Sequence, residues 1–216
     1  MKRILIIFAA LCVTLTMAAN GTCVGGIYYL LDGEEATVTY TGTGYNDNTY
    51  SGAIVIPDTF TYAGDLYTVV AIGEAAFYGC TGLSSITIPS TVWNIDMYAF
   101  SSCSALSSVS LGDNIETLGE AAFSDCTSLT TITLPATVWS LGDYVFSGDS
   151  ALTSITCLAA EPPMLDGEDG FSGVNKSIPP LCPCHQRLGL SGGRPVEGLR
   201  CAGLFGPHGY RGNSET

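Results

Sequence analysis

Apolar residues recur every 23 positions through the middle of the chain. Four consecutive segments, 72–94, 95–117, 118–140 and 141–163, carry them at the same points. One column holds Phe77, Phe100, Phe123 and Phe146, another Leu83, Leu106, Leu129 and Leu152, and a third Ile86, Val109, Ile132 and Ile155. A fixed period of this length predicts a solenoid, because a single coil cannot bury its apolar residues whereas stacked coils form one continuous core.

Each repeat also contains a short stretch in which apolar and hydroxyl residues alternate. In the first copy it runs from Ser85 to Ile88, the pattern of a half-buried strand. Pro89, Gly112 and Pro135 follow this stretch and end it, since proline has no amide to donate and glycine relaxes the turn. Residues 73–77 are too few for a full helix and predict a single helical or 3₁₀ turn. We therefore expect a β-rich solenoid with one short parallel strand in each 23-residue coil.

The segments on either side of the repeats predict how the array ends. Residues 27–40 and 52–70 alternate around Asp-Gly and Ala-Gly-Asp turns and predict two hairpins, so residues 20–71 are interpreted as an N-terminal β-hairpin cap. The solenoid then spans residues 72–178 and finishes with a degenerate fifth coil that has Phe171 in the phenylalanine column. Residues 179–216 show no period and are interpreted as a disordered or out-of-frame tail.

The beginning of the chain predicts export. A basic start, Met1 to Arg3, precedes an apolar run at residues 4–19 and then small residues, which is the layout of a secretory signal peptide over residues 1–19. The apolar run is shorter than the roughly 20 residues of a membrane-spanning helix. We expect a Sec-type signal, cleavage, and a chain that is secreted or displayed at the cell surface with no membrane insertion.

The charge distribution narrows the function. Residues 24–175 contain 18 acidic residues and no Lys, Arg or His, in a chain whose net charge is −13. Nucleic acids and anionic membranes need cations on their partner and are excluded for this part of the chain. The same residues offer no side chain that could act as a base near neutral pH and none that could activate a Ser or Cys nucleophile. The composition therefore predicts no enzyme activity and no cofactor.

Two features suggest metal or thiol chemistry at first sight. Cys80, Cys103 and Cys126 stand one repeat apart, but Asp149 replaces them in the fourth copy, and three stacked thiols cannot all pair. We interpret this column as small buried thiols, since zinc-type Cys pairs and histidines are missing from the array. The acidic loops 32–35 and 166–169 hold oxygen ligands of the kind calcium takes, yet neither matches an EF-hand loop. No metal site is predicted.

The repeat, IGEAAFYGCTGLSSITIPSTVWN in its first copy, resembles the leucine-rich repeat of BspA-like bacterial surface antigens, whose pattern reads roughly IGxxAFxxCxxLxxIxLPxxVxx. The resemblance covers residues 72–163 closely, and residues 24–71 resemble the segment that usually precedes such arrays. It implies a secreted or surface-displayed protein that binds other proteins or host matrix, without chemistry. It also suggests a frameshift, because residues 178–199 can be back-translated, with one cytosine removed, into a segment resembling the family's closing strand.

Two sets of residues are candidates for binding. Outward strand positions form two columns of hydroxyls, namely Ser85, Thr87, Ser108, Ser110, Thr131, Thr133, Ser154 and Thr156. The second set is aromatic and repeats every two coils: Trp93, Trp139, Tyr98 and Tyr144. Because Val92 and Val138 take the core position, both tryptophans are expected to point outward, as in a binding surface. The alternatives are that the hydroxyls simply tolerate solvent and that the rings pack against the array.

These observations lead to one expected function and two alternatives. We expect a non-catalytic leucine-rich repeat protein of adhesion type that recognises a protein or extracellular-matrix ligand. A different reading is a glycan-binding module that uses the Trp and Tyr rings as stacking platforms. The third reading is a truncated, non-functional frameshifted copy.

Overall fold

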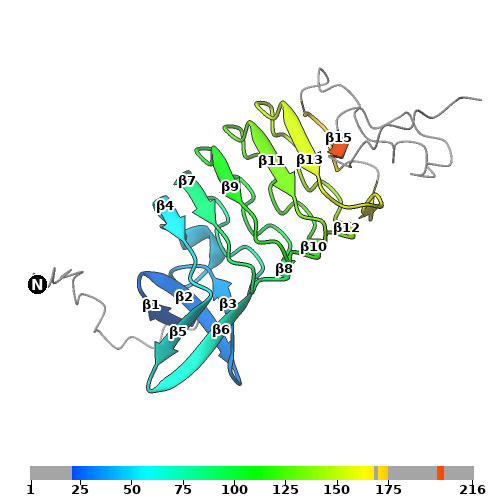
Figure 1. Ribbon diagram of the computed structural model, residues 1–216. Helices are drawn as coiled ribbons and strands as arrows, with labels where there is room; N and C mark the ends of the chain where they lie inside the picture. Colours follow the sequence, from blue (N-terminus) through cyan, green and yellow to red (C-terminus); the bar gives the residue numbers. More distant parts are fainter. Residues whose placement is uncertain (1–20, 168–169, 175–198, 202–216) are drawn as a thin grey trace, which may run out of the picture.

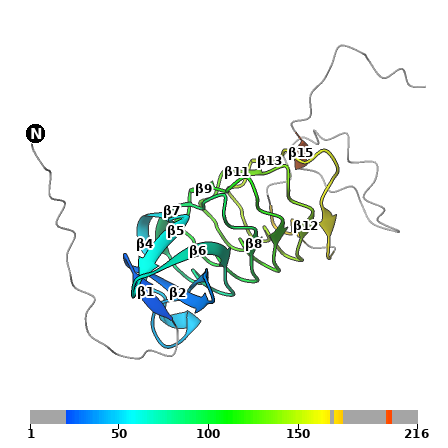
Figure 2. The same cartoon turned by 60° about the horizontal axis from the view of Figure 1, so that its bottom comes forward.

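The computed structural model describes residues 21–167, 170–174 and 199–201. They form an elongated stack of coils with a small β unit at its N-terminal end (Figure 1). The view in Figure 2 shows the same stack along its lower side. The predicted signal peptide, residues 1–19, lies outside the described residues, and so does the predicted tail except for residues 199–201.

The N-terminal unit is built mainly from antiparallel strand pairs. Strands β1 (Thr22–Val24), β2 (Ile27–Asp32) and β3 (Glu35–Thr39) pair in order. A second hairpin joins β5 (Thr59–Tyr62) to β6 (Asp65–Ile72), and β3 pairs with β6 in parallel. A short 3₁₀ turn, η1 (Tyr45–Asp47), lies between the two hairpins. The Asp32-Gly33 turn was predicted, and β2–β3 confirms the first hairpin.

The second predicted hairpin, residues 52–70, was wrong in its first half. Residues Ser51–Val55 form β4, which leaves the cap and pairs in parallel with the first repeat strand, β7. Pro57 follows β4 and lacks the amide that a continuing strand would need, so the chain crosses there to begin β5. The parallel sheet of the solenoid therefore starts before residue 72.

Each coil contributes two parallel strands rather than the one expected. One row consists of β4, β7 (Gly82–Thr87), β9 (Ser108–Ser110), β11 (Thr131–Leu134), β13 (Ser154–Cys157) and β15 (Leu199–Cys201), in two ladders β4-β7-β9 and β11-β13-β15. The other row extends from β6 through β8 (Asn94–Ile95), β10 (Thr117–Leu118), β12 (Ser140–Leu141) and β14 (Met164–Leu165). Two-residue strands are too short to show an alternating pattern, which is why the sequence did not reveal the second row.

The predicted helical turn at residues 73–77 is instead a pair of tight turns. The Ala76 amide donates to the Gly73 carbonyl at 3.1 Å and the Tyr78 amide to the Ala75 carbonyl at 3.0 Å. Ala75 has φ 52°, a left-handed conformation that a right-handed helix cannot contain. Amides of the same segment also bond to the next coil, as Phe77 does to the Ala99 carbonyl at 2.7 Å. The segment is thus a third ladder between coils.

A stack of aromatic rings runs along the centre of the array. The ring centroids of Phe77 and Phe100 are 5.0 Å apart with planes only 6° from parallel, and the next two phenylalanines continue the stack. Tyr50 caps it at the N-terminal end and Phe171 at the other, 5.9 Å from Phe146. The predicted role of Phe171 is confirmed. The leucine column is fully buried beside the rings, so the periodic residues of the sequence are the core.

Close approach between coils predicts a sensitive glycine. A Cβ on Gly142 would lie 2.4 Å from the Glu120 amide nitrogen of the preceding coil, backbone that cannot rotate away. We expect Gly142→Ala to lower the free energy of unfolding by about 1–3 kcal/mol through overpacking. Gly44→Ala is the matched control, since nothing lies within 4 Å of its added Cβ. Urea unfolding of both variants tests this, and equal stabilities would show that the coils can separate without cost.

Candidate binding surfaces

The predicted hydroxyl columns lie on one face of the solenoid, along β7, β9, β11 and β13 (Figure 1). Register pairs Ser85 with Ser108 and Thr131 with Ser154, so equivalent hydroxyls stand on adjacent strands. Five of the eight are exposed and three are half-buried, the latter being Ser85, Ser154 and Thr156. We name this surface the hydroxyl face. Beyond β7 it continues over β4, where the exposed Val55 replaces a hydroxyl.

Hydroxyls at the margin of this face behave differently from those on it. The Ser107 and Thr153 hydroxyls donate to the Ser84 and Thr130 carbonyls of the preceding coils, at 3.2 and 3.1 Å. Among the described residues, Thr87, Ser110 and Thr133 make no such side-chain bond. The marginal hydroxyls therefore tie coils together, whereas those on the face are open to an external partner.

The two tryptophans lie in a separate row, at the edge that leads into the short strands. The Glu116 amide donates to the Trp93 carbonyl at 2.8 Å, and the Trp139 amide donates to the Glu116 carbonyl at 3.0 Å. Trp93, Glu116 and Trp139 are thus equivalent residues of three successive coils, and we name them the aromatic row. Trp93 is 49% exposed and Trp139 54%, while Val92 and Val138 beside them are buried. The predicted outward orientation of both tryptophans is confirmed.

Tyr98 and Tyr144 lie in the turn segments that follow the short strands. Their φ angles are 56° and 55°, and the equivalent Ala75 and Ala121 share the left-handed conformation at 52° and 50°. Because all four 23-residue repeats have it, this conformation belongs to the fold rather than to a binding site. The Tyr98 hydroxyl donates to Glu120 at 2.8 Å, and this hydrogen bond raises the pKa of Tyr98. Tyr98 is half-buried and Tyr144 exposed.

The structure therefore does not bring all predicted binding residues together. The hydroxyl face follows the row β7 to β13, whereas the aromatic row and the tyrosines follow the row β8 to β12, on another side of the coils (Figures 1 and 2). The aromatic pattern skips the coil of Glu116, so the sequence did not indicate this residue as a binding candidate. In the structure it is an exposed carboxylate between two exposed indoles.

The cysteine column is buried, as predicted. The Cys103 and Cys126 thiols donate to the Phe77 and Phe100 carbonyls at 3.0 and 3.2 Å. Burial raises the pKa of Cys126, so this thiol stays protonated and is a poor nucleophile. The buried Cys80, Cys103, Cys126 and Cys157 form no disulfide bond.

Asp149 occupies the same column and is the one acidic side chain in the described core. It is fully buried, its Oδ1 accepts the Cys126 amide at 2.7 Å, and its Oδ2 has no partner. Burial raises the pKa of this carboxyl to about 8, against the opposing effect of the Cys126 amide. Asp149 therefore affects the stability of the fold, and its burial keeps it from contacting a ligand in solution.

The remaining chemical candidates find little support among the described residues. Within residues 21–167 and 170–174, no three His, Cys, Asp or Glu side chains are placed to hold a metal ion. That statement covers the acidic loop 32–35, whereas Glu168 and Asp169 lie outside the described residues. In the same ranges no helix has the length and apolar character needed to cross a membrane.

Tryptophan fluorescence should report on the aromatic row alone, because the chain contains only two tryptophans. Since both indoles are about half exposed, we expect long-wavelength emission, ready quenching by acrylamide, and little further shift on unfolding. The double variant Trp93→Ala, Trp139→Ala should change the free energy of unfolding by less than about 1 kcal/mol. Quencher-protected emission at short wavelength, or a large loss of stability, would show that the rings pack against the array.

Comparison with known proteins identifies the family of the repeat and finds solved structures with a similar fold. Residues 48–160 match the BspA type leucine rich repeat region, in 6 copies. The structure is similar to a T. pallidum leucine rich repeat protein, TpLRR, with 27% identity over 70% of this chain and 66% of that chain, at a TM-score of 0.57. A leucine-rich repeat protein from Bacteroides capillosus gives 31% identity over 63% of this chain and 96% of that one, at 0.56.

A third similar structure is longer than this chain. The leucine-rich repeat protein from Bacteroides ovatus shows 28% identity over 73% of this chain but only 40% of its own, at a TM-score of 0.54. The chain thus spans slightly less than two thirds of the T. pallidum protein and less than half of this one. No curated protein matches the sequence.

Proposed function

We propose that this chain, which belongs to the BspA type leucine rich repeat family, is an exported recognition protein that binds a protein or extracellular-matrix ligand at the bacterial surface. We propose that its role is adhesion and that it does not catalyse a reaction. Its support begins with the family, since solenoid proteins use their extended repeated surfaces for binding. Export is proposed from the residue pattern of the first 19 positions.

The observation that carries the proposal is the exposure of Trp93 and Trp139 in register on one edge. Large aromatic side chains on a solvated surface are costly unless a partner covers them, and Trp is among the residues that contribute most to protein interfaces. The hydroxyl face supplies a second, uncharged surface. Its open hydroxyls suit a partner that reads hydrogen-bond donors and acceptors.

The same exposed rings also favour a glycan-binding alternative. Sugar rings stack on indole faces. Tyr144, which follows Trp139 closely in the sequence, is also exposed. A glycan needs polar side chains around the rings, and the exposed carboxylate of Glu116 between the two tryptophans meets that need. The two functions therefore compete for the same residues and must be separated by binding.

The experiment is a panel of immobilised matrix proteins and glycans, with tryptophan emission and surface plasmon resonance as readouts. The proposal expects at least one matrix protein to bind, and the double variant Trp93→Ala, Trp139→Ala to lose most of that affinity. Emission shifts with glycans and none with proteins would overturn it in favour of the glycan-binding module. Binding to neither panel by a folded, exported chain would favour the non-functional copy.

A further inference from the structure

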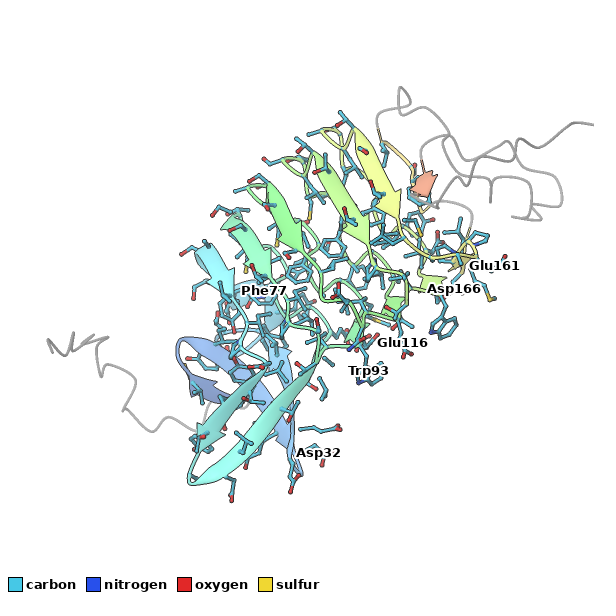
Figure 3. The ribbon with its side chains drawn as sticks, in the orientation of Figure 1. Asp32, Phe77, Trp93, Glu116, Glu161 and Asp166 are labelled. Atoms are coloured by element: carbon cyan, nitrogen blue, oxygen red, sulfur yellow. The ribbon has the colours of Figure 1, made fainter. Side chains whose placement is uncertain are left out.

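The aromatic row has the composition of a cation site. Its three residues stand on consecutive coils, joined by the Glu116 and Trp139 amide bonds already described. Successive parallel strands are about 4.8 Å apart, so the two tryptophans lie about 10 Å apart with the Glu116 position midway. Figure 3 shows Trp93 and Glu116 beside each other at the edge of β8 and β10, both directed away from the ribbon.

This spacing suits a positively charged group between the rings. A cation above Glu116 would be one strand spacing, about 5 Å, from the backbone position of each tryptophan, and an aromatic face attracts a cation over roughly 6 Å. The carboxylate below it supplies the opposite charge and two acceptor oxygens. Indoles are the strongest cation-binding rings among the side chains.

Within the array, no cationic side chain is available to fill this position. Glu116 is exposed and has no side-chain hydrogen bond or ion pair among the described residues. Residues 24–175 contain no Lys, Arg or His. Nearby carboxylates are already engaged, Glu120 by the Tyr98 hydroxyl and Asp166 by the Ser140 hydroxyl at 3.2 Å. Among the described side chains, Glu116 therefore has no cationic partner.

We propose that Trp93, Glu116 and Trp139 bind an arginine side chain of a partner protein. Arginine fits better than lysine, because its planar guanidinium stacks on an aromatic ring while its paired N–H groups bond a carboxylate in two places. This inference rests on the proposed function and adds the chemistry of the partner's contact. A basic partner also suits the acidic array, whose charge would speed the encounter.

The test titrates the purified chain with an arginine-rich peptide, acetylated and amidated, and follows tryptophan emission at low salt. The comparison peptides replace arginine by lysine or by citrulline, its neutral isostere. We expect the citrulline peptide to bind at least about tenfold more weakly and the lysine peptide to be intermediate. Raising the salt concentration should lower the affinity for the arginine peptide, since the site is exposed.

Matched variants separate this site from general acidity. Glu116→Gln should lower the affinity for the arginine peptide by about five- to tenfold, a loss of about 1.0–1.4 kcal/mol of binding free energy. The control is Asp32→Asn, which removes the same charge at the exposed tip of the β2–β3 hairpin, well away from the row in Figure 3. It should leave the affinity within about twofold of the wild type. Equal losses in both variants would overturn the inference, as would equal binding of the citrulline peptide.

The inference and the proposed function can fail separately. Matrix-protein binding that needs the tryptophans but survives Glu116→Gln would keep the proposed function and reject the arginine site. Arginine-peptide binding that depends on Glu116, with no matrix protein bound, would keep the site and reject adhesion. Single Trp93→Ala and Trp139→Ala variants should each weaken the peptide, and an unchanged affinity in either would show that the cation does not lie between the rings.

Discussion

Replacing Phe123 by alanine is expected to lower the free energy of unfolding by about 3–5 kcal/mol. Phe123 is fully buried, and its ring stacks on Phe100 at 5.0 Å and on Phe146 at 5.8 Å. Because intact coils on both sides hold their backbones through regular ladders, the space left by the ring cannot collapse. The measurement is urea unfolding followed by far-ultraviolet circular dichroism.

Phe171→Ala provides the matched comparison. Phe171 occupies the same column, but among the described residues its ring stacks only on Phe146, at 5.9 Å, and it is only half-buried. We expect a clearly smaller loss, because less apolar surface returns to water and fewer neighbours lose contacts. Equal losses at both positions would mean that the C-terminal coil is as well covered as the middle of the array.

The second large effect is a loss of stability as the pH rises, caused by Asp149. Its ordinary pKa is 3.8 and burial raises it to about 8 in the folded chain. Between these values the folded carboxyl holds a proton that the unfolded chain releases, so the contribution to stability is complete below about pH 4 and lost through about pH 8. At about 1.4 kcal/mol per pKa unit, the loss is at most on the order of 6 kcal/mol.

Two substitutions isolate this contribution. Asp149→Cys restores the residue of the other coils, of which Cys103 and Cys126 donate to the phenylalanine carbonyl of the preceding coil. Asp149→Asn keeps the shape and an acceptor for the Cys126 amide but cannot ionise. We expect both variants to be more stable than the parent near pH 8, with a smaller difference near pH 5. Urea unfolding at both pH values decides, and a parent whose stability relative to Asp149→Asn does not fall with pH would contradict the raised pKa.

The core of the array was predictable because its signal repeats. Each phenylalanine, leucine and cysteine column follows the 23-residue period, and a side chain that faces inward in one coil must do so in the next. The outward direction of Trp93 could be inferred for the same reason, since Val92 beside it belongs to a buried column. Periodicity thus determined which residues are inside and which are outside.

Periodicity could not determine how neighbouring segments pair. Strand β4 resembles the cap in sequence but joins the parallel sheet, and the two-residue strands β8, β10 and β12 carry no readable alternation. The turn at residues 73–77 looked helical because its left-handed Ala75 has no sequence signature. These features arise from hydrogen bonds to the next coil, which local propensity does not contain.

The sequence by itself determined the solenoid, its acidic array and the candidate residues, because each repeats or is counted along the chain. Only the tertiary structure decided which candidates share a surface. It separated the hydroxyl face from the aromatic row and placed Glu116 at the centre of that row. It also placed Asp149 without a partner for one oxygen in the core. The position of a residue in the repeat predicts its column. Its protonation state and its contacts depend on the residues of neighbouring coils, which the repeat pattern does not specify.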